Sequence, residues 1–172
     1  GFEVHFACGK WGSSIARDEG MEPIALQSVS PEKFYGRLNT GKFFYRPEEL
    51  EGYVRSEREV ISAVEPDLVV GDFRLTLPIS THLARVPMLS LINAYWSPGF
   101  DCLLPPPSAG PLRFLAHWPL RRFFDLMQPV FLKDFCAPLS RLRKQHGMND
   151  SLSLREHYTA GDWCAYLDHP AC

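Results

Sequence analysis

The stretch "DLVVGDFRLTLPIS", residues 67–80, contains a short apolar run, an acidic residue and the beginning of a helical pattern. Leu68, Val69 and Val70 form a continuous apolar run, which is typical of a strand buried on both faces of a parallel sheet. Asp72 follows directly, where the strand should end and its loop begin, and a helix is expected from about Leu77 to Arg85. The stretch therefore predicts the strand, loop and helix that repeat in α/β folds.

The same alternation of strands and helices continues on both sides of this stretch. Upstream, an alternating strand, a short helix stopped by Gly20 and a second short strand form one β-α-β unit, and Pro47 opens the chain's clearest helix. Downstream, "PMLSLINAYW" is a further apolar strand. The pattern predicts a Rossmann-like open parallel sheet with helices on both faces. The expected strands are Glu3–Cys8, Pro23–Leu26, Asp67–Val70 and Pro87–Trp96, and the expected helices are Ser13–Glu19, Pro47–Val64 and Leu77–Arg85.

The second half of the chain has a different composition. A Pro-rich connection from Cys102 to Pro111 precedes two helices, which Pro119, Pro129 and Pro138 are expected to interrupt. Further along, Ser153 and Glu156 have the spacing of a capping box, and "WCAYLDHP" is expected to form a last strand. We therefore divide residues 1–172 into an α/β core (1–100), a Pro-rich connection with a helix pair (101–150) and a closing helix and strand (151–172).

Composition limits the classes of function. The 172 residues carry 18 Lys and Arg against 20 Asp and Glu, so the formal net charge is −2 and no basic run favours a nucleic-acid partner. The five cysteines are widely spaced and have no CxxC pair, which favours reduced structural thiols over a metal site. No signal-peptide pattern and no apolar stretch long enough to span a bilayer is present, so the cytoplasm is the expected location.

The expected sheet directs attention to three loops. Ligands of open parallel sheets bind at the carboxyl ends of the strands, which are followed here by residues 9–12, 72–75 and 93–99. Aromatic side chains mixed with a few polar ones suit a pocket for a flat or hydrophobic small molecule. The predicted pocket residues are Trp11, Phe73, Arg74, Asn93, Tyr95, Trp96 and Ser97, each with plain loop packing as the alternative.

At these residues the sequence resembles a known family. "EPDLVVGDFRLTLPISTHLARVPMLSLINAYWSP" resembles a stretch through two strands of the N-terminal domain of GT-B glycosyltransferases, in the bacterial UDP-glycosyltransferase-like group that acts on macrolides and flavonoids. "FEVHFAC" is similar to that group's second strand, and "SLREHYTAGDWCAYLDHP" is similar to the segment that closes the domain. The resemblance covers nearly the whole chain.

The resemblance implies that the chain is the acceptor-binding half of such an enzyme. The first strand, the loop with the histidine base and the C-terminal nucleotide-sugar domain have no counterpart among these residues, so the chain is expected to be truncated at both ends and inactive alone. The implied partners are a small hydrophobic, polyphenolic or macrolide-like acceptor and a nucleotide-sugar donor, with no cofactor and no metal.

Asp72 matches the position of the acid that orients this histidine base in the wider superfamily. Such an acid would hold the imidazole in one tautomer and stabilise the imidazolium formed when the acceptor hydroxyl is deprotonated. The alternative is that Asp72 caps the next helix or holds its loop in place.

Two other classes of function stay open. The chain could be a stand-alone Rossmann-like module that binds a small molecule without catalysis. It could also carry an interfacial membrane segment, which its prolines and Asp125 disfavour. The residues of that segment would be Arg113, Phe114, Trp118, Arg121, Arg122, Phe123, Phe124 and Phe131.

Overall fold

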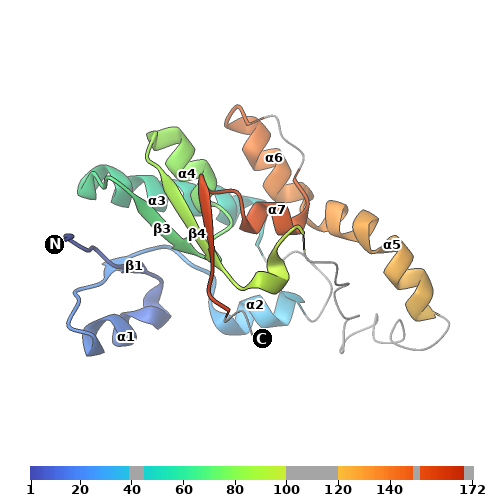
Figure 1. Ribbon diagram of the computed structural model, residues 1–172, viewed down its shortest axis with the longest axis horizontal. Coiled ribbons are helices and arrows are strands. Elements are labelled where there is room, and N and C mark those ends of the chain that lie inside the picture. The colour runs from blue at the N-terminus through green and yellow to red at the C-terminus, as the bar shows by residue number, and fades with distance from the viewer. Residues whose placement is uncertain (39–44, 100–119, 149–151, 169–172) are drawn as a thin grey trace.

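The computed structural model describes residues 1–38, 45–99, 120–148 and 152–168, in which strands and helices alternate (Figure 1). The strands are β1 (Ala7–Cys8), β2 (Ile24–Ala25), β3 (Val69–Asp72), β4 (Met88–Ile92) and β5 (Trp163–Tyr166). The helices are α1 (Ser13–Asp18), α2 (Pro31–Leu38), α3 (Pro47–Val64), α4 (Leu77–Ala84), α5 (Leu120–Phe135), α6 (Ala137–Gln145) and α7 (Leu154–Tyr158). Two short 3-10 helices, Lys10–Gly12 and Ala94–Trp96, follow β1 and β4.

All strand pairs of the described chain are parallel, as the alternation predicts. β1 pairs with β2, while β4 lies between β3 and β5 in a second sheet. Asp72 is in register with Leu91, and Ile92 is in register with Tyr166, so these strands end at one edge of the sheet. The expected α/β class with a Rossmann-like parallel arrangement is therefore found.

Helices α4, α3 and α6 pack in succession behind the three-stranded sheet (Figure 1). The Thr81 hydroxyl of α4 donates to the sulfur of Met88 on β4 at 3.6 Å. Buried side chains of α3, α4 and α6 then form the main core, with Leu50, Ile79 and Leu139 completely inaccessible to solvent. This core holds the sheet and the loops at its carboxyl edge in place.

Local signals placed several helix boundaries correctly. Pro47 lies in the first turn of α3, and the Ser153 hydroxyl accepts a hydrogen bond from the Glu156 backbone N–H at 3.4 Å, which completes the expected capping box of α7. Gly20 has a φ of +75° directly after α1, as a helix stop requires. Arg85 takes a left-handed conformation, so α4 ends at Ala84.

Several expectations differ from the structure. The single sheet is divided into two, because no hydrogen-bonded pairing joins β1 or β2 to the other described strands. The first strand is only Ala7–Cys8, since pairing to the equally short β2 ends there, and Phe2 is 99% exposed. Helix α5 runs through position 129, so Pro129 does not interrupt it, whereas Pro138 does lie at the start of α6.

Burial of β3 on both faces is also not found among the described residues. Gly71 is buried on the face that α4 covers, but Val70 points to the opposite face and is 52% exposed. Trp163, on β5, is 57% exposed on the same face. Helices on both faces of this sheet therefore remain an expectation, and the Pro-rich connection lies outside the described residues.

Candidate functional site

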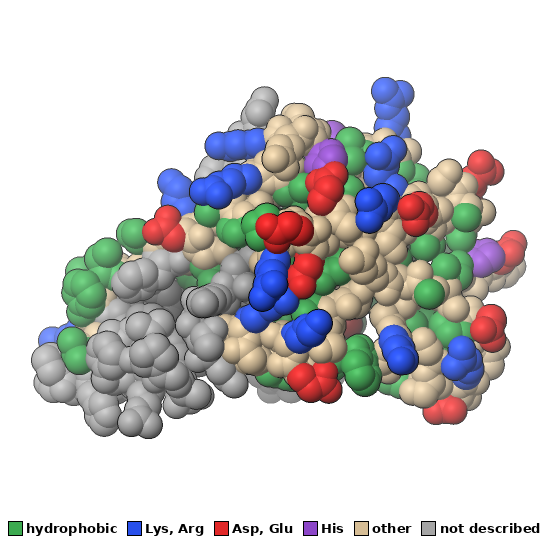
Figure 2. All heavy atoms as spheres, turned by 180° about the vertical axis from the view of Figure 1, so that it is seen from behind, with side chains coloured by type: hydrophobic (Ala, Val, Ile, Leu, Met, Phe, Trp, Pro, Cys, Tyr) green, Lys and Arg blue, Asp and Glu red, His purple; other side chains and the backbone are tan. Residues whose placement is uncertain are grey.

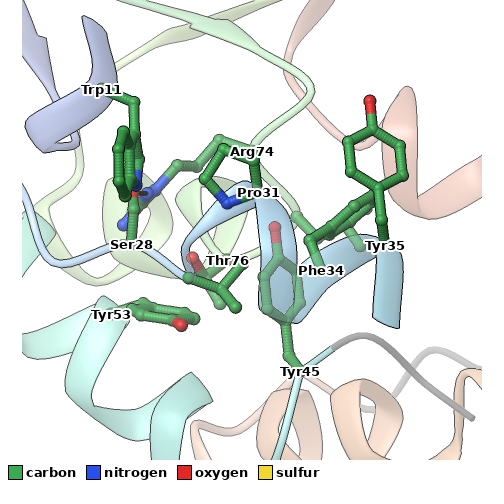
Figure 3. A pocket seen from close by; sticks show the side chains of 11 residues that line it. Trp11, Ser28, Pro31, Phe34, Tyr35, Tyr45, Tyr53, Arg74 and Thr76 are labelled. Atoms are coloured by element: carbon green, nitrogen blue, oxygen red, sulfur yellow. Dashed lines mark hydrogen bonds between the residues drawn. The ribbon is translucent and has the colours of Figure 1, made fainter. Parts of the chain in front are cut away.

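A pocket of about 290 Å³ lies where the loops after three parallel strands meet (Figure 3). Trp11 comes from the segment after β1, Ser28 from the loop after β2, and Arg74 from the loop after β3. Helices α2 and α3 supply further walls. The lining residues are Trp11, Ser28, Val29, Pro31, Phe34, Tyr35, Tyr45, Tyr53, Arg74, Leu75 and Thr76.

Arg74 is held in the pocket by hydrogen bonds from all three of its guanidinium nitrogens. Nε donates to Glu57 Oε1 at 2.5 Å, one terminal nitrogen donates to the Ser28 hydroxyl at 2.7 Å, and the other donates to the Gln27 carbonyl at 2.8 Å. The guanidinium carbon also lies 5.3 Å from the centre of the Tyr53 ring, within cation–π range. These contacts tie the loop after β2 to α3 and to the end of β3.

Glu57 is a charged residue in the protein interior, with only 1% of its surface exposed. Besides Arg74, its carboxylate accepts hydrogen bonds from the Thr76 and Ser80 hydroxyls, each at 2.5 Å. A buried carboxylate is tolerated when it is paired and its oxygens are hydrogen-bonded, and both conditions are met here. The wall of the pocket therefore contains a neutralised ion pair.

Two tyrosines of the pocket pack against each other. The rings of Tyr45 and Tyr53 meet edge to face with centroids 5.4 Å apart. Burial raises the pKa of Tyr53 to about 12 and also raises the pKa of Tyr45. Both phenols are therefore neutral at physiological pH, and both side chains line the pocket.

Phe73 and Trp96 lie close together, as expected for loops at one edge of the sheet. Neither residue lines the pocket; they belong to a separate cluster of aromatic side chains. Their ring centroids are 6.1 Å apart, and both rings contact Tyr158 of α7, at 4.9 and 4.8 Å. Tyr95 is 46% exposed and stacks beside Trp96. These rings form an aromatic cluster between the loops after β3 and β4.

The backbone at Phe73 is strained. Its φ of +49° is in the left-handed region, which a bulky side chain seldom adopts. Residues held in such conformations cost about 1–3 kcal/mol and concentrate at functional sites. The strain lies between Asp72 and Arg74, the two charged residues predicted for this site.

Asp72 is the last residue of β3 and is exposed at the surface. Partial burial nevertheless raises the pKa of its carboxyl group above the usual range. The N-cap of α4 is Thr76, and the structure shows no hydrogen bond from the described residues to the Asp72 carboxylate. Asp72 therefore does not cap the following helix, and its orienting role stays a prediction.

Asn93 and Ser97 belong to the loop after β4, and hydrogen bonds hold this loop in place. The Ser97 carbonyl accepts from Arg155 at 3.1 Å, and the Ser97 hydroxyl accepts from the Tyr166 hydroxyl at 3.1 Å. The Asp168 carboxylate accepts from the Ala94 backbone N–H. Neither Asn93 nor Ser97 lines the pocket, so their predicted contact with an acceptor stays a prediction.

Sequence reasoning missed several pocket residues, notably Ser28, Tyr45 and Tyr53, and it also missed Glu57, the buried partner of Arg74. Ser28 could have been found, because it follows a strand of the β-α-β unit and the rule that selected the other loops applies to it equally. For Glu57 no local signal exists, because a glutamate within a helix is normally exposed.

Other site types have little support in the described part of the chain. No group of three or more His, Cys, Asp or Glu residues there could hold a metal ion. Acidic and basic side chains are interspersed on the face seen in Figure 2. No described helix is long and apolar enough to cross a membrane. In the interfacial segment considered above, Phe123 is 54% exposed, whereas Arg113, Phe114 and Trp118 lie outside the described residues.

The fold and the pocket define an α/β protein with a candidate small-molecule site in the loops that follow parallel strands. No protein-family profile matches the chain. Across 98% of its length, the chain is 32% identical to an inactive PGL/p-HBAD biosynthesis glycosyltransferase of Mycobacterium bovis, of which it covers 46%. It has the same identity to a PGL/p-HBAD biosynthesis glycosyltransferase of Mycobacterium tuberculosis and a PGL/p-HBAD biosynthesis rhamnosyltransferase of Mycobacterium bovis, covering 40% and 38% of them.

The chain thus spans less than half the length of these relatives. Because the relatives along the whole chain are named glycosyltransferases, the similarity supports glycosyltransferase as the class of protein.

Proposed function

We propose that this chain is the acceptor-binding part of a glycosyltransferase that moves a sugar from a nucleotide-sugar donor to a hydroxyl of a small hydrophobic acceptor. The observation that carries this proposal is the aromatic pocket at the carboxyl edge of the parallel strands, in a chain similar throughout to glycosyltransferases. The donor domain and the catalytic base would come from parts of the enzyme outside these residues, so the chain alone would transfer no sugar.

The lining of the pocket favours a hydrophobic acceptor, either a flat polyphenol or a macrolide-like compound. Aromatic side chains, among them Trp11, Phe34 and Tyr53, line it together with the Ser28 hydroxyl (Figure 3). Such a mixture of ring faces and a few polar groups orients a small ligand without requiring a charge on it.

The GT-B architecture is the finer part of the proposal. The described strands form two separate parallel sheets, and each sheet has unpaired edges. One further parallel strand that paired with an edge of each would join them into a single sheet. This arrangement is compatible with a GT-B N-terminal domain whose first strand lies outside these residues.

Asp72 would act as a positioning residue for the base. Its exposed carboxylate at the carboxyl end of β3 is available to accept a hydrogen bond from an imidazole N–H. The acid would fix the histidine tautomer and stabilise the imidazolium that forms as the acceptor hydroxyl attacks the sugar.

A transfer assay on the complete enzyme tests this function. With a flat hydroxylated acceptor and a panel of nucleotide sugars, we expect Trp11→Ala to raise the KM for the acceptor about tenfold and to leave the KM for the donor within about twofold. Trp163→Ala is the matched control, because Trp163 is similarly exposed but lies on β5, away from the pocket.

A larger effect of Trp11→Ala on the donor KM would contradict the assignment of the pocket, and sugar transfer by this chain alone would contradict the proposed division of labour. Binding of the acceptor by the complete protein without transfer from any nucleotide sugar would favour the stand-alone binding module.

A further inference from the structure

The ion pair between Arg74 and Glu57 gives the pocket a property that its residue types alone do not indicate. An arginine in an aromatic pocket would ordinarily attract a carboxylate or phosphate group. Here the side chain of Glu57 has no exposed surface and that of Arg74 is 19% exposed, and their atoms approach to 2.5 Å. The positive charge is therefore compensated inside the protein, before any ligand enters.

The hydrogen-bonding capacity of Arg74 is also largely used. A guanidinium has five N–H groups, and three of them donate to Glu57, Ser28 and the Gln27 carbonyl. Because three N–H groups are already engaged and Tyr53 lies beside the guanidinium, at most two N–H groups, one on each terminal nitrogen, remain for an incoming carboxylate. It would also lie close to the Glu57 carboxylate, which repels it.

We propose that Glu57 is a specificity-determining residue, which makes this pocket select uncharged aromatic ligands over acidic ones by neutralising Arg74. The inference deepens the proposed function, and rests on it only for the assignment of the pocket to the acceptor. In this arrangement an anionic ligand loses its water shell without gaining a free cation, while a neutral ring loses little on entry.

A charge series on one ring system tests the inference without any mutation. Naphthol, naphthoate and naphthylmethylammonium are neutral, anionic and cationic at pH 7, and each can be titrated into the protein by calorimetry, with amide shifts of Ser28 and Arg74 locating the site. We expect naphthol to bind at least about tenfold more tightly than either ion. If naphthoate bound most tightly and naphthylmethylammonium most weakly, the pocket would present the uncompensated charge of Arg74. This result would overturn the proposal.

Glu57→Gln keeps the shape of the side chain and removes its charge. In this variant we expect naphthoate binding to tighten about tenfold while naphthol binding changes by less than about threefold, because Arg74 becomes an uncompensated cation. Glu49→Gln is the matched control: Glu49 is another α3 carboxylate paired with an arginine, Arg37 at 2.5 Å, and neither residue lines the pocket. The ligand preference of this control should equal that of the unmodified protein.

The outcomes separate this inference from the proposed function. Equal binding of naphthol and naphthoate, or a ligand preference unchanged by Glu57→Gln, overturns the role of Glu57 but leaves the pocket as an acceptor site. Failure of all three compounds to shift the Ser28 and Arg74 amides overturns both. If Glu57→Gln does not fold, the charge series on the unmodified protein still decides.

Discussion

Gly71 of β3 and Leu77 of α4 approach so closely that a Cβ atom at position 71 would lie 2.5 Å from Leu77 Cδ2. It would also lie 2.9 Å from the terminal carbon of Met88 on the neighbouring strand. The absence of a side chain at Gly71 thus allows α4 to pack against the sheet next to Asp72 and the loop that carries Arg74.

We expect Gly71→Ala to lower the free energy of unfolding by about 1–3 kcal/mol, because the added methyl group overpacks a filled interface. Urea denaturation followed by circular dichroism measures this. Gly36→Ala is the control: a Cβ at this position of α2 meets no atom within 4 Å, so the substitution should stabilise by up to about 1 kcal/mol. Equal effects of the two substitutions would show that the contact with Leu77 is relaxed in solution.

Removal of the buried carboxylate should be more costly. We expect Glu57→Ala to destabilise by about 3–5 kcal/mol, because Arg74 would lose its ion-pair partner and the Thr76 and Ser80 hydroxyls their acceptor. Glu59→Ala, at an exposed position of the same helix, should change the free energy of unfolding by less than about 0.5 kcal/mol. A loss of under about 1 kcal/mol for Glu57→Ala would mean that the ion pair is not formed.

The Arg37–Glu49 pair should make stability depend on pH in the acidic range. Two hydrogen bonds from Arg37, at 2.5 and 2.8 Å, are the main cause that lowers the pKa of Glu49 in the folded state. Because this pKa lies below that of the unfolded chain, the stabilisation is fully present above about pH 4.3 and is lost as the pH falls through the folded-state value.

Arg37→Met should therefore be less stable than the unmodified protein by about 1 kcal/mol near pH 7, with the difference shrinking below about pH 4. Urea midpoints measured between pH 7 and 3 would show this convergence. Glu156, whose pKa is lowered by its hydrogen bonds to Ser153, is present in both proteins and cancels in the comparison. A difference that stays constant with pH would exclude Glu49 as the titrating group.

Asp72→Asn in the complete enzyme should keep the fold and the affinity for the acceptor while lowering kcat by roughly 100-fold or more, because the orienting charge acts mainly when the base becomes cationic. Asp67→Asn is the control, since Asp67 is exposed just before the other end of β3. Steady-state kinetics with both substrates distinguishes the effects. If the kcat of the Asp72→Asn enzyme equalled that of the unmodified enzyme, Asp72 would have no role in the mechanism.

Some features of this protein follow from the sequence alone. The helix from Pro47, the capping box of Ser153 and Glu156, and the stop at Gly20 are set by interactions within a few residues, so their sequence signals are complete. The apolar runs likewise identify β3 and β4, and the alternation of elements indicates parallel strands. The loops after β1 and β3 could be selected as site candidates for the same reason.

Only the tertiary structure decides which of these side chains meet. Arg74 contacts Glu57 on α3 and Ser28 after β2, and Phe73 packs against Tyr158 of α7, although nothing in the intervening sequence specifies these partners. Position 129 is helical despite its proline, and β1 ends where its pairing with β2 ends. Helix starts, caps and stops depend on interactions within a few residues and can be recognised from the sequence. A pocket and its charge depend on contacts between segments far apart in the chain.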